Sequence, residues 1–131
     1  MKRKNIIIFV LAILLPIFLI IAYLWQSRQI LTFYVKNNLS ANISSVKISL
    51  LEEDNQVSKY FYSISPQEEK TFIWNVTNKV KSDGGYLIEV FQEDDLVFSK
   101  NFGYFTNGGH LDKNYYIEIN NDKIEIEINK K

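Results

Sequence analysis

Residues 114–129 read NYYIEINNDKIEIEIN, two runs of alternating apolar and polar residues on either side of a polar turn. Side chains on a β-strand alternate between its two faces. The apolar residues take odd positions up to Ile119 and even positions from Ile124 onward. One face can hold them all only if odd positions pair with even ones, which sets Ile119 opposite Ile124 and Ile117 opposite Ile126. The stretch therefore predicts an antiparallel hairpin, and a slip by one residue would expose three isoleucines.

The same period of two recurs from Ile30 onward, between short segments rich in turn-forming residues such as SPQEE, SDGG and NGG. Many short strands with turns every 8–12 residues are typical of an antiparallel sandwich or barrel. We expect an all-β, immunoglobulin-like sandwich of about 7–8 strands, preceded by a helix. The predicted strands cover residues 30–36, 43–51, 57–64, 70–76, 86–92, 96–102, 114–119 and 123–129.

The resemblance to immunoglobulin domains is one of architecture only. Their DxGxYxC stretch is echoed by Asp83, Gly85 and Tyr86, but Tyr86 comes one residue early and no cysteine follows. The chain contains no cysteine at all, which excludes disulfides, thiolate metal sites, a cysteine nucleophile and a lipid-modified N-terminal cysteine.

The N-terminal segment has a different character. Lys2, Arg3 and Lys4 precede an uncharged run from Ile6 to Trp25, in which 15 of 20 residues are Ile, Leu, Val or Phe. Twenty helical residues span about 30 Å, the thickness of the hydrocarbon core of a bilayer. Cations before the run keep the N-terminus in the cytoplasm. The sequence predicts an uncleaved signal anchor that crosses the membrane once.

A signal peptide cleaved after Ala22 is the alternative. Such peptides have an apolar region of about 7–15 residues and small residues just before the cleavage site. Here the apolar run is longer, and the large residue Ile20 stands at a position before the cut where a small residue is expected. A linker of four residues would reach about 13 Å, so the domain should stand close to the bilayer. The expected organisation is a cytoplasmic tail (1–5), a transmembrane segment (6–25), a linker (26–29) and an extracytoplasmic domain (30–131).

Charge and composition limit the partners. Residues 26–131 carry 12 basic and 15 acidic side chains, a net charge of −3, and a mildly acidic domain without a basic stripe is a poor nucleic-acid binder. The chain holds 18 Ile, 13 Asn and 13 Lys, a bias typical of AT-rich bacterial genomes. We therefore expect a bacterial inner (cytoplasmic) membrane protein with its C-terminal domain in the periplasm or outside the cell.

Sequence signals for chemistry are weak. One histidine and no cysteine make a zinc site unexpected. No GxSxG, HExxH or phosphate-binding glycine loop is present. Glu93, Asp94 and Asp95 lie together between two strand patterns, which indicates a polar turn more than an acid/base pair. We expect no enzyme and no cofactor.

A second acidic group follows from the register of the C-terminal hairpin, which places Glu118 opposite Glu125 with Glu127 diagonal to it. These carboxylates are either a site for a hard cation such as calcium or an exposed acidic face relieved by Lys123. The second interpretation is favoured because strand carboxylates without carbonyl-rich loops make poor calcium cages, and we expect no metal.

The segment FGYFTNGGHLDKN, residues 102–114, combines aromatic residues, glycines and the single histidine. Gly103 indicates a bulge or a strand end, and NGG indicates a turn. Tyr104 and Phe105 point to opposite faces if the strand continues, so one of them could contact a partner. The alternative is a loop that closes the sandwich. The candidate partner-binding residues are Tyr104, Phe105, Asn107 and His110.

The expected function is that of a protein-binding accessory or assembly factor of a bacterial envelope complex. A narrower version is an immunity protein against a toxin that acts in the envelope. The alternative is a carbohydrate- or cation-binding module at the cell surface.

Overall fold

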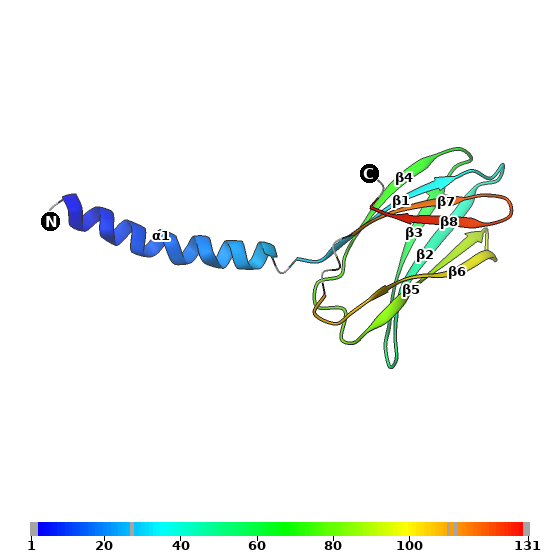
Figure 1. Ribbon diagram of the computed structural model, residues 1–131. Helices are drawn as coiled ribbons and strands as arrows, with labels where there is room; N and C mark the ends of the chain where they lie inside the picture. Colours follow the sequence, from blue (N-terminus) through cyan, green and yellow to red (C-terminus); the bar gives the residue numbers. More distant parts are fainter. Residues whose placement is uncertain (1–2, 27, 110, 112, 130–131) are drawn as a thin grey trace.

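The computed structural model describes residues 3–26, 28–109, 111 and 113–129, which form one helix followed by two four-stranded β-sheets (Figure 1). All eight predicted strands are present, and the largest shift is at the end of β6, which continues three residues beyond the expected Phe102. The elements are α1 (Arg3–Gln26), β1 (Ile30–Asn37), β2 (Ile43–Glu52), β3 (Gln56–Ile64), β4 (Glu69–Asn75), β5 (Gly84–Gln92), β6 (Asp95–Phe105), β7 (Lys113–Ile119) and β8 (Ile124–Ile128).

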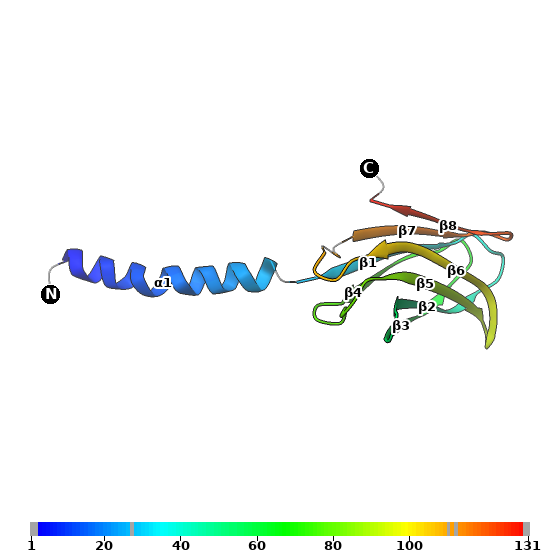
Figure 2. The same ribbon diagram turned by 60° about the horizontal axis from the view of Figure 1, so that its bottom comes forward.

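The two sheets pack face to face as a sandwich (Figure 2). Their strand orders are β4-β1-β7-β8 and β3-β2-β5-β6. The antiparallel expectation is wrong for one pair, because β1 and β7 run parallel. The constant-type immunoglobulin order places the first two strands in one sheet, whereas β1 and β2 lie in different sheets here. The immunoglobulin-like arrangement is therefore not confirmed, and the domain is an eight-stranded sandwich.

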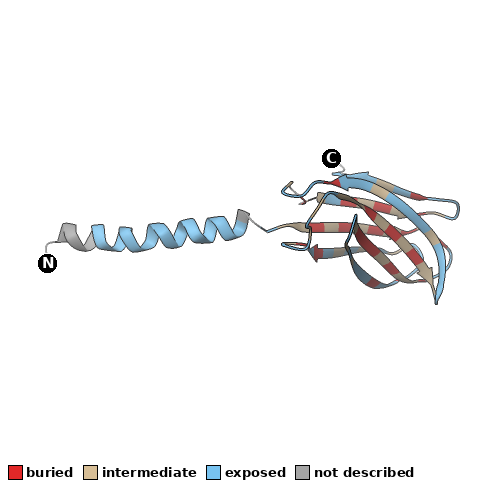
Figure 3. Cartoon of the chain, turned by 90° about the horizontal axis from the view of Figure 1, so that it is seen from below, coloured by how far each residue is buried: buried red, intermediate tan, exposed pale blue. Residues whose placement is uncertain are grey.

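Alternating burial along the strands builds the core. In β1, Leu31, Phe33 and Val35 are fully buried, while Thr32 and Tyr34 on the outer face are half-buried. Burial alternates in the same way along β5 and β7, and Figure 3 shows buried residues alternating with less buried ones along strands of the sandwich. This burial needs no disulfide, as expected for a domain of this size.

The register of the β7–β8 hairpin is confirmed, because Ile119 pairs with Ile124 and Ile117 pairs with Ile126. Burial nevertheless declines along β8: Ile124 is buried, Ile126 is half-buried and Ile128 is 46% exposed. The expected apolar face is therefore present, but its last isoleucine is only partly covered.

Two lysines on edge strands point inward, and each bonds to a backbone carbonyl oxygen of the opposite sheet. Lys59 on β3 donates a hydrogen bond from its Nζ to the carbonyl oxygen of Ile73 on β4, at 3.3 Å. Lys100 on β6 donates in the same way to the carbonyl oxygen of Ile124 on β8, at 2.6 Å. Inward-pointing charges of this kind protect sheet edges from pairing with other chains.

Helix α1 projects away from the sandwich (Figure 1). Its segment Ile8–Trp25 is apolar and long enough to cross a membrane, and none of this segment is covered by the rest of the described chain. A helix that is apolar on all sides and uncovered by protein fits an apolar solvent, whereas a core helix of a soluble domain would be packed.

Candidate functional site

A β-bulge at Gly103 shapes the predicted site. Tyr86 pairs with Phe102 and Gly85 pairs with Tyr104, so Gly103 is an extra residue in β6. Its φ of +60° suits glycine, and a Cβ there would lie 3.1 Å from Cδ2 of Tyr86. The extra residue shifts the alternation by one, so that the side chain of Tyr104 turns outward.

The bulge also determines that the side chain of Phe105 points into the core. Phe102 and Phe105 both face the core, and the ring centroid of Phe105 lies 5.1 Å from that of Tyr86. Phe105 is only 2% exposed. As a partner-binding candidate Phe105 is therefore wrong, because its ring belongs to the core, whereas Tyr104 is 60% exposed.

Asp83 holds Tyr104 and the following turn in place. The Tyr104 hydroxyl donates to Oδ2 of Asp83 at 3.0 Å, and the backbone N–H of Asn107 donates to Oδ1 of the same carboxylate at 2.8 Å. The Asn107 side-chain amide donates to the carbonyl oxygen of Lys81 at 2.8 Å. The hydrogen bond to Asp83 raises the pKa of Tyr104 above its usual value, so the hydroxyl remains a neutral donor.

Glu52, at the end of β2, binds the loop between β4 and β5, which also contains Asp83. Its Oε1 accepts hydrogen bonds from the backbone N–H groups of Lys81 at 2.5 Å and Ser82 at 2.9 Å. Desolvation opposes ionisation of Glu52, but the hydrogen bonds from Ser82, the Asn55 side chain and Lys81 outweigh it and lower the pKa. The loop is therefore held by two carboxylates, Glu52 and Asp83.

This end of the sandwich is the end at which α1 enters. The backbone N–H of Val76 donates to the carbonyl oxygen of Gln29, and the N–H of Gln29 donates to Oγ1 of Thr77. We call residues 76–83 and 104–109 the helix-side corner.

A cavity of about 160 Å³ lies in the helix-side corner, next to the start of β1. Gln29 lines it, and the Gln29 Oε1 atom is buried with no hydrogen-bond partner among the described residues. The remaining lining residues are Val76, Asn78, Val80, Thr106, Asn107, Gly108, Gly109 and Leu111.

The structure thus brings together two of the four predicted residues, Tyr104 and Asn107, both exposed on the corner. His110 lies outside the described residues. Asp83, the hydrogen-bond partner of both residues, was not predicted from the sequence, because it lies 21 and 24 residues away from them along the chain.

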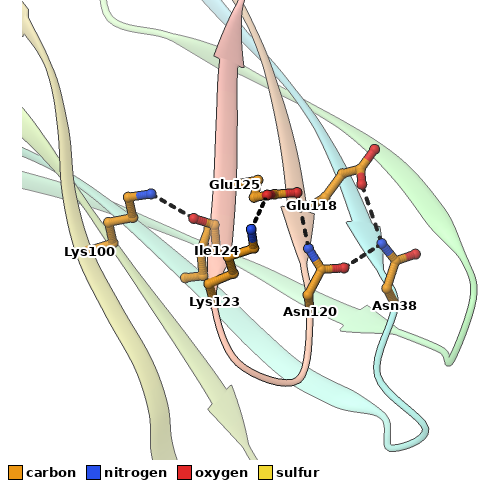
Figure 4. A network of polar contacts seen from close by, with 7 residues as sticks. All are labelled: Asn38, Lys100, Glu118, Asn120, Lys123, Ile124 and Glu125. Carbon is orange, nitrogen blue, oxygen red and sulfur yellow. Dashed lines mark hydrogen bonds and ion pairs between the residues drawn. The ribbon is translucent and has the colours of Figure 1, made fainter.

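In the acidic cluster of the β7–β8 hairpin, neighbouring side chains offset the negative charge of the carboxylates (Figure 4). Glu118 is paired opposite Glu125 as predicted, and Lys123 forms an ion pair with Glu125 at 2.6 Å. Asn38 donates to Glu118 at 3.5 Å, and Asn120 donates to Glu125 at 3.4 Å. Within the described ranges, no group of three or more His, Cys, Asp or Glu residues is placed to hold a metal ion.

Comparison with known proteins gives no assignment, since no family model matches the chain and no match is found among curated proteins.

Proposed function

We propose that α1 anchors this chain in a bacterial cytoplasmic membrane and that the sandwich, on the outer side, binds another envelope protein through the helix-side corner. The observation that carries the proposal is Tyr104, a tyrosine that is 60% exposed and yet fixed by a hydrogen bond to Asp83. Exposed aromatic rings that anchor a partner dominate many protein interfaces.

Preorganisation favours this role. Binding costs free energy for every flexible side chain that becomes ordered at an interface. Asp83 already holds both the Tyr104 hydroxyl and the backbone of Asn107, so less ordering would be needed on association. The raised pKa keeps the Tyr104 hydroxyl neutral.

The position of the corner indicates where the partner would be. Trp25, at the end of the apolar segment, lies in the region where aromatic side chains meet the membrane interface, and the guanidinium of Arg28 lies 5.7 Å from its ring centroid. The corner is tied to Gln29, directly after this point. A partner bound there would itself lie in or next to the membrane.

The narrower version, an immunity protein against an envelope-acting toxin, is compatible with the same surface. A small-molecule or carbohydrate role has less support at this corner, because the corner cavity of about 160 Å³ is smaller than the roughly 300–1,000 Å³ of common ligand sites.

Replacing Tyr104 with alanine tests the proposal. We expect partner affinity to fall by about thirtyfold, corresponding to roughly 2 kcal/mol. The melting temperature should change little, because the ring is exposed. The measurement pairs co-purification of partners from detergent-solubilised membranes with thermal melting of the full chain.

Tyr62→Ala is the matched control, because Tyr62 is 67% exposed and pairs with Ser45 near the opposite end of the sandwich. It should retain the partner. Loss of the partner from both variants, or from neither, would contradict the assignment to the corner. A large drop in melting temperature for Tyr104→Ala would show instead that the ring serves folding.

A further inference from the structure

Strand β8 is a free edge of the sandwich. It pairs with β7 on one side, and no described strand pairs with its other side. Figure 2 shows β8 at the margin of the sheet, with β7 between it and β1. The other edge of this sheet, β4, has Lys59 bonded to Ile73, an interior residue of the strand, whereas the corresponding bond of Lys100 reaches the first residue of β8, Ile124.

The inner face of β8 is incompletely covered. Phe102 on β6 packs against Tyr115 on β7, with ring centroids 5.3 Å apart. The opposite sheet therefore covers β7, and over β8 it reaches the start of the strand, where Lys100 bonds to Ile124. This explains why Ile126 is half-buried and Ile128 is 46% exposed, on a face whose other isoleucines are buried.

The outer face of the same strand is acidic. Both outer-face residues within β8 are carboxylates, Glu125 and Glu127, and Lys123 forms an ion pair with Glu125. The Lys123 ion pair lowers the pKa of Glu125, which keeps that carboxylate ionised. The free edge therefore alternates between apolar inner positions and carboxylates on the outer face, Glu125 and Glu127.

A second copy of β8 is a poor occupant for this edge. Antiparallel pairing with Ile126 opposite Ile126 of the copy would set Glu125 opposite Glu127, and like charges directly opposed are unfavourable. A shift by one residue would set glutamate opposite isoleucine on both faces. The complement is a strand with basic residues on one face and apolar residues on the other.

The geometry points to β8 as a docking edge for an extended segment of another protein, in which basic and apolar side chains alternate. The segment would add to the sheet by main-chain hydrogen bonds, as edge-strand ligands do. Its basic side chains would lie beside Glu125 and Glu127, and its apolar side chains would cover Ile126 and Ile128. This surface is separate from the helix-side corner and does not depend on the role of Tyr104.

The test uses the full chain in a non-ionic detergent and three short blocked peptides. One alternates lysine with valine, one alternates glutamate with valine, and one has the lysines and valines in two separate blocks. Binding is measured by fluorescence anisotropy at low and high salt, and hydrogen exchange reports on the amides of β8. We expect the alternating lysine peptide to bind tightest, to weaken in salt and to protect these amides.

The double variant Glu125→Lys/Glu127→Lys should weaken this peptide by roughly tenfold to thirtyfold, from the loss of two cross-strand charge pairs. The control Glu53→Lys/Asp54→Lys makes the same change in charge on the exposed β2–β3 turn and should have little effect. Thermal melting confirms that both variants fold.

Three outcomes would each overturn the proposal: equal binding of the alternating and block peptides, equal losses of binding in both variants, or no binding of any peptide. Tyr104→Ala should leave peptide binding unchanged, so the two functional claims can fail separately.

Discussion

Replacing Asn37 with alanine is expected to destabilise the sandwich by about 3 kcal/mol or more, because it breaks a buried hydrogen-bond network. Asn37 is fully buried. Its Nδ2 donates to the carbonyl oxygens of Ala41 at 2.9 Å and Ile64 at 3.0 Å, and its Oδ1 accepts from the N–H of Leu39 at 2.9 Å. Alanine would leave these three groups without their partner, and each unpaired buried group costs about 1–3 kcal/mol.

The neighbouring Asn38 provides the control. It is half-buried, and its side chain donates to Asn120 at 2.9 Å and to Glu118 at 3.5 Å on the outer face. Asn38→Ala should therefore cost about 1 kcal/mol or less. Urea unfolding of the full chain in mild detergent, followed by the fluorescence of the buried Trp74, compares the two. Similar costs for both variants would contradict the role given to Asn37.

Gly84→Ala is expected to have a comparably large effect for a different reason. A Cβ at Gly84 would lie 2.1 Å from the carbonyl oxygen of Leu51 and 2.7 Å from Cζ of Phe105. The first of these atoms belongs to the backbone of the paired strand β2, so the sheet itself would have to move. Overpacking a core commonly costs about 1–3 kcal/mol, and a clash with backbone should reach or exceed the upper end.

Gly85 tests this explanation directly. A Cβ there would meet only the carbonyl oxygen of Gly103, at 3.4 Å, which is an ordinary contact. Gly85→Ala should therefore melt close to the parent chain, while Gly84→Ala melts well below it. Equal melting temperatures would mean that the close approach of β2 to β5 at Gly84 is not present in solution.

Much of the fold follows from local pattern. The alternation of isoleucines fixed the register of Ile119 opposite Ile124, because a slip by one residue would expose a whole face. Turn residues gave the strand bounds within a few positions. The parallel pairing of β1 with β7 was not predicted, because it joins segments about eighty residues apart and no local signal distinguishes it from an antiparallel pairing.

The candidate site was predictable only in part. The glycine at position 103 indicated a bulge, and the structure has one there. Tyr104 faces solvent and Phe105 faces the core because Gly103 is an extra residue in β6. Without this extra residue, the alternation along the strand would turn the two side chains the other way. The hydrogen bonds from Tyr104 and Asn107 to Asp83 connect the end of β6 and the turn after it to the loop between β4 and β5, so they form only when β5 and β6 pair.

We propose above all that α1 remains part of the mature chain and that the sandwich stands on the outer side of the membrane. The three N-terminal cations and the uncovered apolar segment are the physical basis of this claim. The decisive measurement adds a protease to cells whose outer barrier has been opened, with a tag on the N-terminus. We predict that residues 30–131 are digested while the tag and the apolar segment stay with the membrane. A released chain that begins at Tyr23, or a sandwich that is digested only after the membrane is dissolved, would contradict the claim.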